Sequence, residues 1–213
     1  MRSAKDLPDL HGKFISFEGG DGAGKTTQIR RLADVLGDAG YHVIVTREPG
    51  GSKGGEHIRE LLVTGSADRW SPMTEALLMY ASRRDHLEKV IQPALDNLSV
   101  VLTDRFSDST MAYQGIAGAL GPDAARTLQS LVVGNQMPDL TIVLDTDANG
   151  LERADTSGGE GRFENKGSAF QSRVREAFRQ IASENPERCV LVDAAGSIDD
   201  VHMRVLDAII RHF

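Results

Sequence analysis

Cysteine is almost absent from this sequence of 213 residues, since Cys189 is the only one. A single cysteine excludes an internal disulfide framework. Its apolar neighbours Val190 and Leu191 predict a buried thiol in a strand. Long apolar runs are absent too, and none approaches the roughly 18 residues that a membrane-spanning helix needs. We therefore expect a protein without disulfides that does not bind to a membrane.

Positive charge is in deficit, because the formal net charge is −7 at pH 7. Nucleic-acid binding depends on a broad basic surface that neutralises phosphates, so this balance argues against nucleic acid as a partner. An anionic substrate would have to meet local arginines instead. The histidines show no metal-ligand spacing with each other or with Cys189, which argues against a structural zinc site.

The first residues, MRSAKDLPDLH at 1–11, lack the apolar core of a secretory signal peptide. We interpret them as a loose N-terminal tail and expect a cytoplasmic protein. The chain is long enough for one well-packed domain and marginal for two. We therefore expect a single domain over residues 12–213.

Apolar runs typical of β-strands alternate along the chain with helical patterns. Such alternation forms βαβ units, so it predicts a parallel sheet of about five strands between two helical layers. In this three-layer α/β sandwich, ligands bind at the carboxyl ends of the strands. The runs occupy residues 14–17, 42–45, 99–103, 140–144 and 189–192.

Two helices have recognisable start signals. Ser71 is expected as an N-cap with Pro72 in the first turn, and Pro93 is expected to end that helix or to kink it. Ser168 and Gln171 have the spacing of a capping box at the start of a second helix. The apolar residues of that helix fall on one face, namely Phe170, Val174, Phe178 and Ile181.

The segment FEGGDGAGKTT at residues 17–27 follows the first apolar run. Its spacing Gly19-x-x-x-x-Gly24-Lys25-Thr26 is that of a P-loop, in which backbone N–H groups surround phosphate oxygens. Lys25 can reach the outer phosphates, the Thr26 hydroxyl can bind Mg²⁺, and the following helix directs its N-terminus at the anion. The segment therefore predicts a nucleoside triphosphate site. The residues expected there are Gly19, Gly20, Asp21, Gly22, Ala23, Gly24, Lys25, Thr26 and Thr27.

Three further stretches fall where this topology places ligand contacts. TREPGG at 46–51 follows the second strand, and DRFSDSTMAYQG at 104–115 follows the third. Asp104 supplies a carboxylate suited to Mg²⁺ or its water shell, beside Arg105, a fork-shaped cation suited to a phosphate. Met79 and Arg83 lie four residues apart and share one helix face. Taken singly, each feature also fits a surface ion pair or core packing.

Together these segments resemble the thymidylate kinase family. GGDGAGKTT, TREPGG and DRFSDSTMAYQG occur in the family's order and spacing, and the resemblance runs from about residue 12 to the C-terminus. It implies the fold of a P-loop nucleoside monophosphate kinase. It also implies transfer of the γ-phosphoryl group of ATP to dTMP, giving dTDP and ADP for dTTP synthesis, with Mg²⁺ as cofactor. Family members are typically homodimers, so we expect a homodimer here.

The resemblance also assigns roles to residues of this chain. Arg47 and Arg105 would bind the 5′-phosphate of dTMP, and Arg83 would donate to the thymine ring. Asp21 would meet the 3′-hydroxyl, and Tyr113 would lie where a 2′-hydroxyl projects. The remaining expected contacts to dTMP are Glu48, Pro49, Ser109 and Gln114, with the last two near the base, and Met79, which stands where the family usually carries Phe.

The stretch at about residues 150–167 is polar and Gly-rich. It fits a solvated loop or a mobile lid, and the resemblance implies a lid that closes over ATP. The P-loop lacks an arginine, so the chain resembles the bacterial form that places catalytic arginines in the lid. Asp155 and Ser157 stand where further lid arginines are common. The catalytic residues expected are therefore Lys25, Arg105, Arg153 and Arg162, and the metal ligands expected are Thr26 and Asp104.

Other interpretations share the P-loop. A GTPase would have a DxxG element, which Asp193 to Gly196 spells, but an Asn-Lys-x-Asp element should follow it. Here Asn165-Lys166 lies upstream and lacks the Asp. A nucleotide sensor without catalytic activity and a kinase for another monophosphate stay open. Turnover of dTMP separates the sensor from an enzyme.

Overall fold

The computed structural model describes residues 7–66, 68–146 and 167–213. One sheet of five strands, all parallel, has the order β2-β3-β1-β4-β5, which confirms the predicted sheet. The predicted runs match the strands to within two residues at each end. The strands are β1 (Phe14–Gly19), β2 (Val43–Arg47), β3 (Val100–Asp104), β4 (Leu140–Asp145) and β5 (Cys189–Asp193).

Helices connect consecutive strands. Between β1 and β3 they are α1 (Lys25–Asp38), α2 (Lys53–Val63), α3 (Pro72–His86), the π-helical turn η2 (Leu87–Ile91) and α4 (Gln92–Asp96). After β3 they are α5 (Ser107–Thr110), the π-helical segment η3 (Met111–Ile116), α6 (Pro122–Val132), α8 (Ser168–Glu184) and α9 (Ile198–His212).

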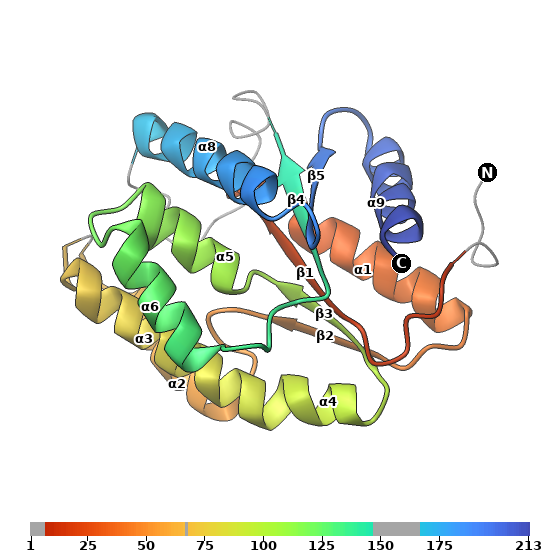
Figure 1. Ribbon diagram of the computed structural model, residues 1–213, viewed down its shortest axis with the longest axis horizontal. Helices are drawn as coiled ribbons and strands as arrows, with labels where there is room; N and C mark the ends of the chain where they lie inside the picture. The colour runs from red at the N-terminus through yellow and green to blue at the C-terminus, as the bar shows by residue number, and fades with distance from the viewer. Residues whose placement is uncertain (1–6, 67, 147–166) are drawn as a thin grey trace.

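The sheet is covered on both faces. Helices α1 and α9 lie together on one side, and α3, α6 and α8 lie on the other (Figure 1). Successive side chains of a strand point to opposite faces of the sheet, so β1 contributes apolar side chains to both helical layers. Ile15 and Phe17 pack with the apolar side chains of α1 and α9, whereas Phe14 packs with Tyr80 and Phe106 on the opposite face.

The start signals were right for one helix and wrong for the other. Ser71 caps α3, since its hydroxyl accepts from Thr74 N over 3.2 Å. At α8 the N-cap is Gly167, with φ of 81°, and no side chain caps the helix. Ser168 is already helical, so the predicted capping box is wrong. The apolar face of α8 is nevertheless buried as predicted.

Of the two outcomes expected at Pro93, a helix end or a kink, the helix end is wrong. The helical path continues through η2 and then through α4 to Asp96. At the junction, Gln92 N donates to Leu87 O, five residues earlier. Pro93 therefore lies in the first turn of α4, where a missing N–H costs little because the hydrogen-bond ladder changes register there.

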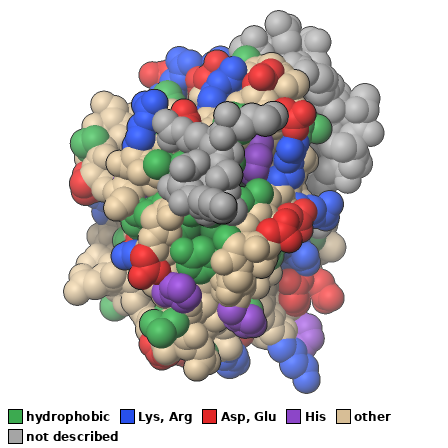
Figure 2. All heavy atoms as spheres, turned by 90° about the vertical axis from the view of Figure 1, so that its right-hand side faces the viewer, with side chains coloured by type: hydrophobic (Ala, Val, Ile, Leu, Met, Phe, Trp, Pro, Cys, Tyr) green, Lys and Arg blue, Asp and Glu red, His purple; other side chains and the backbone are tan. Residues whose placement is uncertain are grey.

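Three surface and burial features complete the fold. Cys189 is buried at the start of β5, as predicted. None of the described helices combines the length and apolar character needed to cross a membrane. On the face shown in Figure 2, Lys and Arg side chains are interspersed with Asp and Glu side chains.

The strand register brings three predicted motifs to one edge of the sheet. Asp104 at the end of β3 pairs with Arg47 of β2 on one side and with Phe17 of β1 on the other. The P-loop leaves β1 two residues after Phe17, so it lies beside DRFSDSTMAYQG, and TREPGG lies beyond. This carboxyl edge is where a parallel sheet places its ligands.

Candidate active site

The P-loop turns tightly out of β1. Gly19 has a φ of 130°, and a Cβ on it would lie 2.4 Å from Leu144 O of β4, so only glycine fits at this position. Gly24 has a φ of 86° and is the N-cap of α1. Between them Gly20, Asp21, Gly22 and Ala23 form the loop. The backbone amides at the start of α1 therefore open into a concave turn suited to phosphate oxygens.

Lys25 is folded back onto this turn. Its Nζ donates to Gly20 O over 2.8 Å and to Gly19 O over 3.3 Å, and the side chain is 7% exposed. Burial lowers the pKa of Lys25 to about 8, and the Arg105 charge acts in the same direction. Asp104 and Asp21 oppose this shift. A buried ammonium held by two carbonyls is available to an incoming phosphate at little reorganisation cost.

Thr26 and Asp104 meet, as expected for metal ligands. Thr26 Oγ1 donates to Asp104 Oδ2 over 2.7 Å. A hydroxyl and a carboxylate beside a triphosphate site are hard oxygen donors of the kind that Mg²⁺ prefers, so these residues fit that ion. Thr27 follows on the exposed side of α1.

A second cavity, of about 230 Å³, adjoins the P-loop. It is lined by segments from the P-loop, the loop after β2, α2, α3 and the region after β3. Of the residues expected to bind dTMP, those lining it are Asp21, Glu48, Pro49, Met79, Arg83, Arg105, Ser109, Tyr113 and Gln114. The others that line it are Arg59, Val63, Phe106 and Thr110.

Arg105 is the centre of the cavity's polar network. It has a φ of 70°, which is unusual for a residue with a side chain. Its guanidinium donates to Asp21 Oδ1 over 2.6 Å, to Ser109 Oγ over 2.9 Å and to Gly19 O over 3.2 Å. Burial acts to raise the pKa of Asp21, but the charges of Arg105 and Lys25 and the hydrogen bonds from Tyr113 and Arg105 together outweigh it and hold that pKa below its ordinary value. Arg105 is thus a preorganised cation beside the P-loop.

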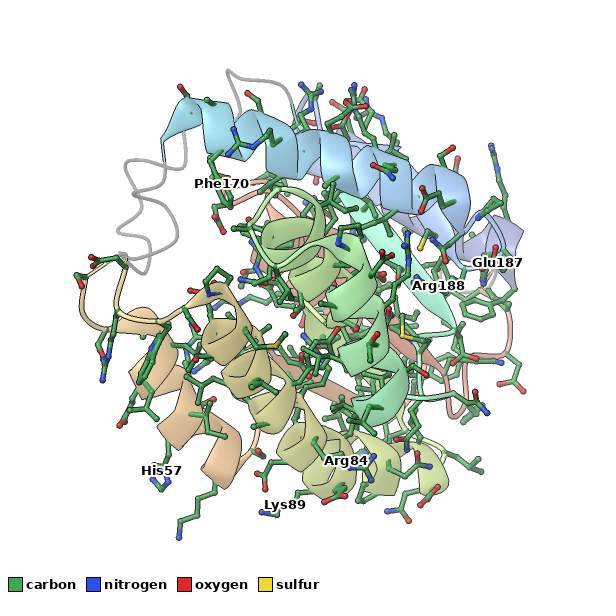
Figure 3. All side chains as sticks on the ribbon, turned by 60° about the vertical axis from the view of Figure 1, so that its left-hand side comes forward. His57, Arg84, Lys89, Phe170, Glu187 and Arg188 are labelled. Atoms are coloured by element: carbon green, nitrogen blue, oxygen red, sulfur yellow. The ribbon has the colours of Figure 1, made fainter. Side chains whose placement is uncertain are left out.

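Tyr113 is held in place by hydrogen bonds at its hydroxyl and by aromatic packing against its ring. Its hydroxyl donates to Asp21 Oδ2 over 3.1 Å and accepts from Arg105 over 3.2 Å. Phe170 extends from the first turn of α8 toward η3 (Figure 3), and its ring centroid lies 6.2 Å from that of Tyr113. The Phe178 ring meets the Tyr113 ring edge-on, with 6.1 Å between the two ring centroids. The Tyr113 ring therefore forms a fixed wall of the cavity.

Glu18 lies beneath this network and was not among the predicted residues. It is fully buried and accepts from Phe106 N over 2.7 Å and from Ser109 Oγ over 2.5 Å. Burial raises the pKa of Glu18 to about 7, and the nearby Asp108 carboxylate adds to the increase. Glu18 thus holds the turn that carries Arg105 and Ser109.

Arg83 is anchored from three directions. Its Nε donates to Glu48 Oε2 over 2.7 Å, and its terminal nitrogens donate to Phe106 O and Thr110 Oγ1. Glu48 in turn meets His86 Nδ1 over 3.0 Å. The guanidinium is therefore fixed at the wall of the cavity, which suits a directional contact to a planar base.

Arg47 is a predicted phosphate ligand that the structure does not bring to the cavity. Its side chain is 55% exposed and pairs with Glu56 over 3.1 Å. Arg59 of α2 lines the cavity instead and donates to Pro49 O over 2.6 Å. Helical spacing after TREPGG could have indicated Arg59, because it lies three residues beyond Glu56 on the helix that follows directly.

Gln114 and Met79 both line the cavity. Gln114 Nε2 donates to Glu75 Oε1 over 2.9 Å. Glu75, Met79 and Arg83 follow one another at intervals of four along α3, so all three share one face. Arg153 and Arg162, as well as Asp155 and Ser157, lie outside the described residues.

A P-loop that opens beside an arginine-lined cavity, at the carboxyl edge of a parallel sheet, defines a P-loop nucleoside monophosphate kinase. The profile of the thymidylate kinase family matches residues 17–205. The chain therefore belongs to the thymidylate kinase family.

Individual relatives agree with this assignment. The thymidylate kinase of Caulobacter vibrioides is 56% identical over 201 residues, covering 94% of this chain and 97% of the relative. That of Dinoroseobacter shibae is 52% identical over 187 residues, covering 85% and 88%. The crystal structure of thymidylate kinase from Ehrlichia chaffeensis superimposes with a TM-score of 0.75 at 34% identity, covering 92% of this chain and 97% of that one.

Proposed function

We propose that the P-loop of this chain holds ATP and that the adjoining cavity holds dTMP as the phosphoryl acceptor. The family to which the chain belongs consists of ATP:dTMP phosphotransferases, which produce dTDP and ADP. The proposal assigns the donor to Gly19 through Thr27 and the acceptor to the cavity beside them.

One observation carries the proposal. Lys25 Nζ and Arg105 Nη1 both donate to the same atom, Gly19 O, over 3.3 and 3.2 Å. Lys25 belongs to the triphosphate turn and Arg105 lines the acceptor cavity. Two cations that share one carbonyl therefore lie where the triphosphate turn meets the acceptor cavity, which is where a phosphoryl group would pass between the two sites.

The chemistry needs no dedicated base. A phosphate monoester dianion is already nucleophilic, so the main obstacle is its repulsion by the triphosphate. Lys25 and Arg105 would neutralise this charge and align donor with acceptor. Asp21, held by Arg105, would accept a hydrogen bond from the 3′-hydroxyl. Arg59, which lines the cavity, is a further candidate for the 5′-phosphate alongside Arg47.

We further propose that Thr26 and Asp104 hold Mg²⁺ or its water shell. Their hydroxyl and carboxylate oxygens lie 2.7 Å apart beside the P-loop. Bound there, the ion would neutralise and orient the phosphates.

The lid is a proposal from the sequence. We propose that residues 150–167 close over ATP and that Arg162 contacts charge that develops during transfer, whereas Arg153 binds the donor. Arg162→Ala should then lower kcat by about 10³-fold, by analogy with catalytic arginines elsewhere. Arg153→Ala should lower kcat and also raise the KM for ATP. Lys166→Ala tests the reserve candidate for this charge, for which a solvated surface charge is the alternative. Wild-type kinetics in both arginine variants would exclude this role for the lid.

We also propose a homodimer that forms through the face made by α2 and α3. Leu61 of α2 and Met73 and Leu77 of α3 are large apolar side chains that are at least two-fifths exposed. Leu77→Glu should convert a dimer to a monomer in sedimentation experiments. Leu191→Glu, an equally exposed position on the edge strand β5, should not. A monomeric wild-type protein at micromolar concentration would contradict the proposal.

The activity is tested by an assay that couples ADP release to a visible signal. The panel of acceptors is dTMP, dUMP, UMP, dCMP, AMP and GMP, each with and without Mg²⁺. We expect turnover with dTMP in the presence of Mg²⁺ and little or none without it. Binding of dTMP without turnover would indicate a nucleotide sensor, and a preference for AMP or GMP would indicate a different monophosphate kinase.

A further inference from the structure

Two hydrogen-bonded pairs join α3 to the segment after β3, one on each side of Met79. Arg83 pairs with Thr110, and Glu75 pairs with Gln114. Arg83 follows Glu75 along α3, whereas its partner Thr110 precedes Gln114 along the other segment. The two segments therefore run antiparallel. Met79 lies between the pairs on α3 and lines the cavity with Arg83 and Gln114.

The pair of Glu75 with Gln114 is buried and directional. Glu75 is 5% exposed, Gln114 is 4% exposed, and Gln114 Nε2 lies 2.9 Å from Glu75 Oε1. The amide nitrogen donates this hydrogen bond and the carboxylate oxygen accepts it, so the amide has its nitrogen turned toward Glu75. The amide oxygen then points the other way. Within the described part of the chain this oxygen has no hydrogen-bond partner, and Gln114 lines the cavity.

The Arg83 side chain can only donate hydrogen bonds, in contrast to the acceptor oxygen of Gln114. A guanidinium has five N–H groups and no acceptor. The hydrogen bonds to Glu48, Phe106 and Thr110 occupy four of them, which leaves one N–H on Nη1. Arg83 and Gln114 both line the cavity, so the part that they line, here called its base end, has a donor available from Arg83 and an acceptor available from Gln114.

We infer that Glu75 is a positioning residue for base recognition, because it holds the Gln114 amide with its oxygen toward the base. The inference rests on the proposed function and deepens it. Thymine and uracil carry a keto oxygen next to a ring N–H, which complements a donor beside an acceptor. Cytosine carries an amino group next to a ring nitrogen with a lone pair, which opposes the same arrangement at both positions. Glu75 thus selects keto pyrimidines without touching them.

Glu75→Gln tests the inference with an almost isosteric change. A neutral amide can accept or donate, so Gln114 is no longer held in one orientation. We expect the ratio of kcat/KM for dUMP to that for dCMP to fall by about tenfold or more, since one buried mismatched polar contact has an effect of this order. The KM for ATP should not change. A purely structural role would lower kcat/KM equally for both acceptors and leave the ratio unchanged, which would overturn the inference.

Glu88→Gln is the matched control. Glu88 is half-exposed on the same helical path and pairs with Arg84, so its amide should leave the ratio at the wild-type value. The double variant Glu75→Gln/Gln114→Glu exchanges the two groups and again presents an acceptor oxygen to the base. We expect this double variant to recover selectivity relative to Glu75→Gln. Failure to recover it in a folded double variant would count against the inference.

A measurement on the unmodified enzyme does not depend on the folding of any variant. In 3-deaza-dUMP a C–H group replaces the ring N–H and the neighbouring keto oxygen becomes a hydroxyl, so the amide oxygen of Gln114 loses its partner and the Arg83 N–H meets a hydroxyl in place of a keto oxygen. The kcat/KM for this analogue should be at least about tenfold below that for dUMP. Equal values would overturn the inference while dTMP turnover still supported the proposed function. Absence of dTMP turnover by the wild-type enzyme would instead reject the proposed function itself.

Discussion

Arg83 Nε lies 2.7 Å from Glu48 Oε2, and each of the two side chains is only 2% exposed. The pair joins the loop after β2 to α3, and His86 extends it by a contact to the other carboxylate oxygen of Glu48. A buried ion pair is costly to break, because removal of one partner leaves the other charge without solvent or counter-charge. The base end of the cavity therefore depends on a carboxylate that comes from a different strand connection.

Glu48→Ala should lower the free energy of unfolding by about 3–5 kcal/mol, because it leaves the Arg83 guanidinium buried and unpaired. It should also raise the KM for dTMP. The control is Glu88→Ala, which removes a half-exposed partner of Arg84 and should cost no more than about 1 kcal/mol. Urea denaturation measures the free energy of unfolding of both variants. Equal losses in the two variants would show that burial of the Glu48 pair has no energetic consequence.

Lys25→Met should lower kcat by at least about 10³-fold, because the ammonium that faces the transferring phosphates is lost. The fold should persist. Lys89→Met, at an exposed position, should leave kcat unchanged. A correctly folded Lys25→Met variant with wild-type turnover would reject the P-loop assignment.

Lys25 should also contribute to the pH dependence of stability. Its pKa is about 8 in the folded protein, and the ordinary value is 10.5. Between these values the unfolded chain binds more protons, so the free energy of unfolding should rise with pH across this window. Lys25→Met should remove this contribution and Lys89→Met should not. Denaturation at pH 8 and pH 10.5 measures it, and identical pH slopes in the two variants would contradict the buried environment of Lys25.

Glu18 should act on stability in a lower pH window. Its pKa is about 7 when folded, against an ordinary value of 4.5, so the folded state binds more protons between these values. The free energy of unfolding should therefore fall as pH rises from about 4.5 to 7, by up to about 3 kcal/mol. Glu18→Gln should remove this decrease, whereas Glu187→Gln, at an exposed position, should retain it. A decrease that persists in Glu18→Gln would assign it to other groups.

Tyr113 should exclude ribose by means of its ring rather than its hydroxyl. The ring is fixed by Phe170 and Phe178, and the hydroxyl contacts Asp21 and Arg105. Tyr113→Phe keeps the ring, so its preference for dUMP over UMP should stay within about threefold of wild type. Tyr113→Ala should lower that preference by about tenfold or more. If wild-type enzyme used UMP as efficiently as dUMP, Tyr113 could not have this role.

Features encoded by short-range spacing were predictable. The P-loop, the strand runs and the placement of Thr26 near Asp104 follow from residues close together in the chain or from the rule that parallel strands end at one edge. The errors are also local, namely the capping box at Ser168 and the helix end that was one of two outcomes expected at Pro93. The residues at these two positions are compatible with more than one local backbone conformation, and the surrounding packing decides which one forms.

The sequence by itself determined the P-loop, the parallel sheet and the edge at which the site lies, because these depend on periodicity and on spacing within single segments. Only the tertiary structure decided that Arg59 rather than Arg47 lines the cavity, that Glu18 supports the turn after β3, and that Glu75 orients Gln114. Each of these depends on contacts between residues on separate segments, 39 positions apart for Glu75 and Gln114 and 91 for Glu18 and Ser109. The direction of a long polar side chain depends on the partner that it finds across such distances, and no local pattern records that partner.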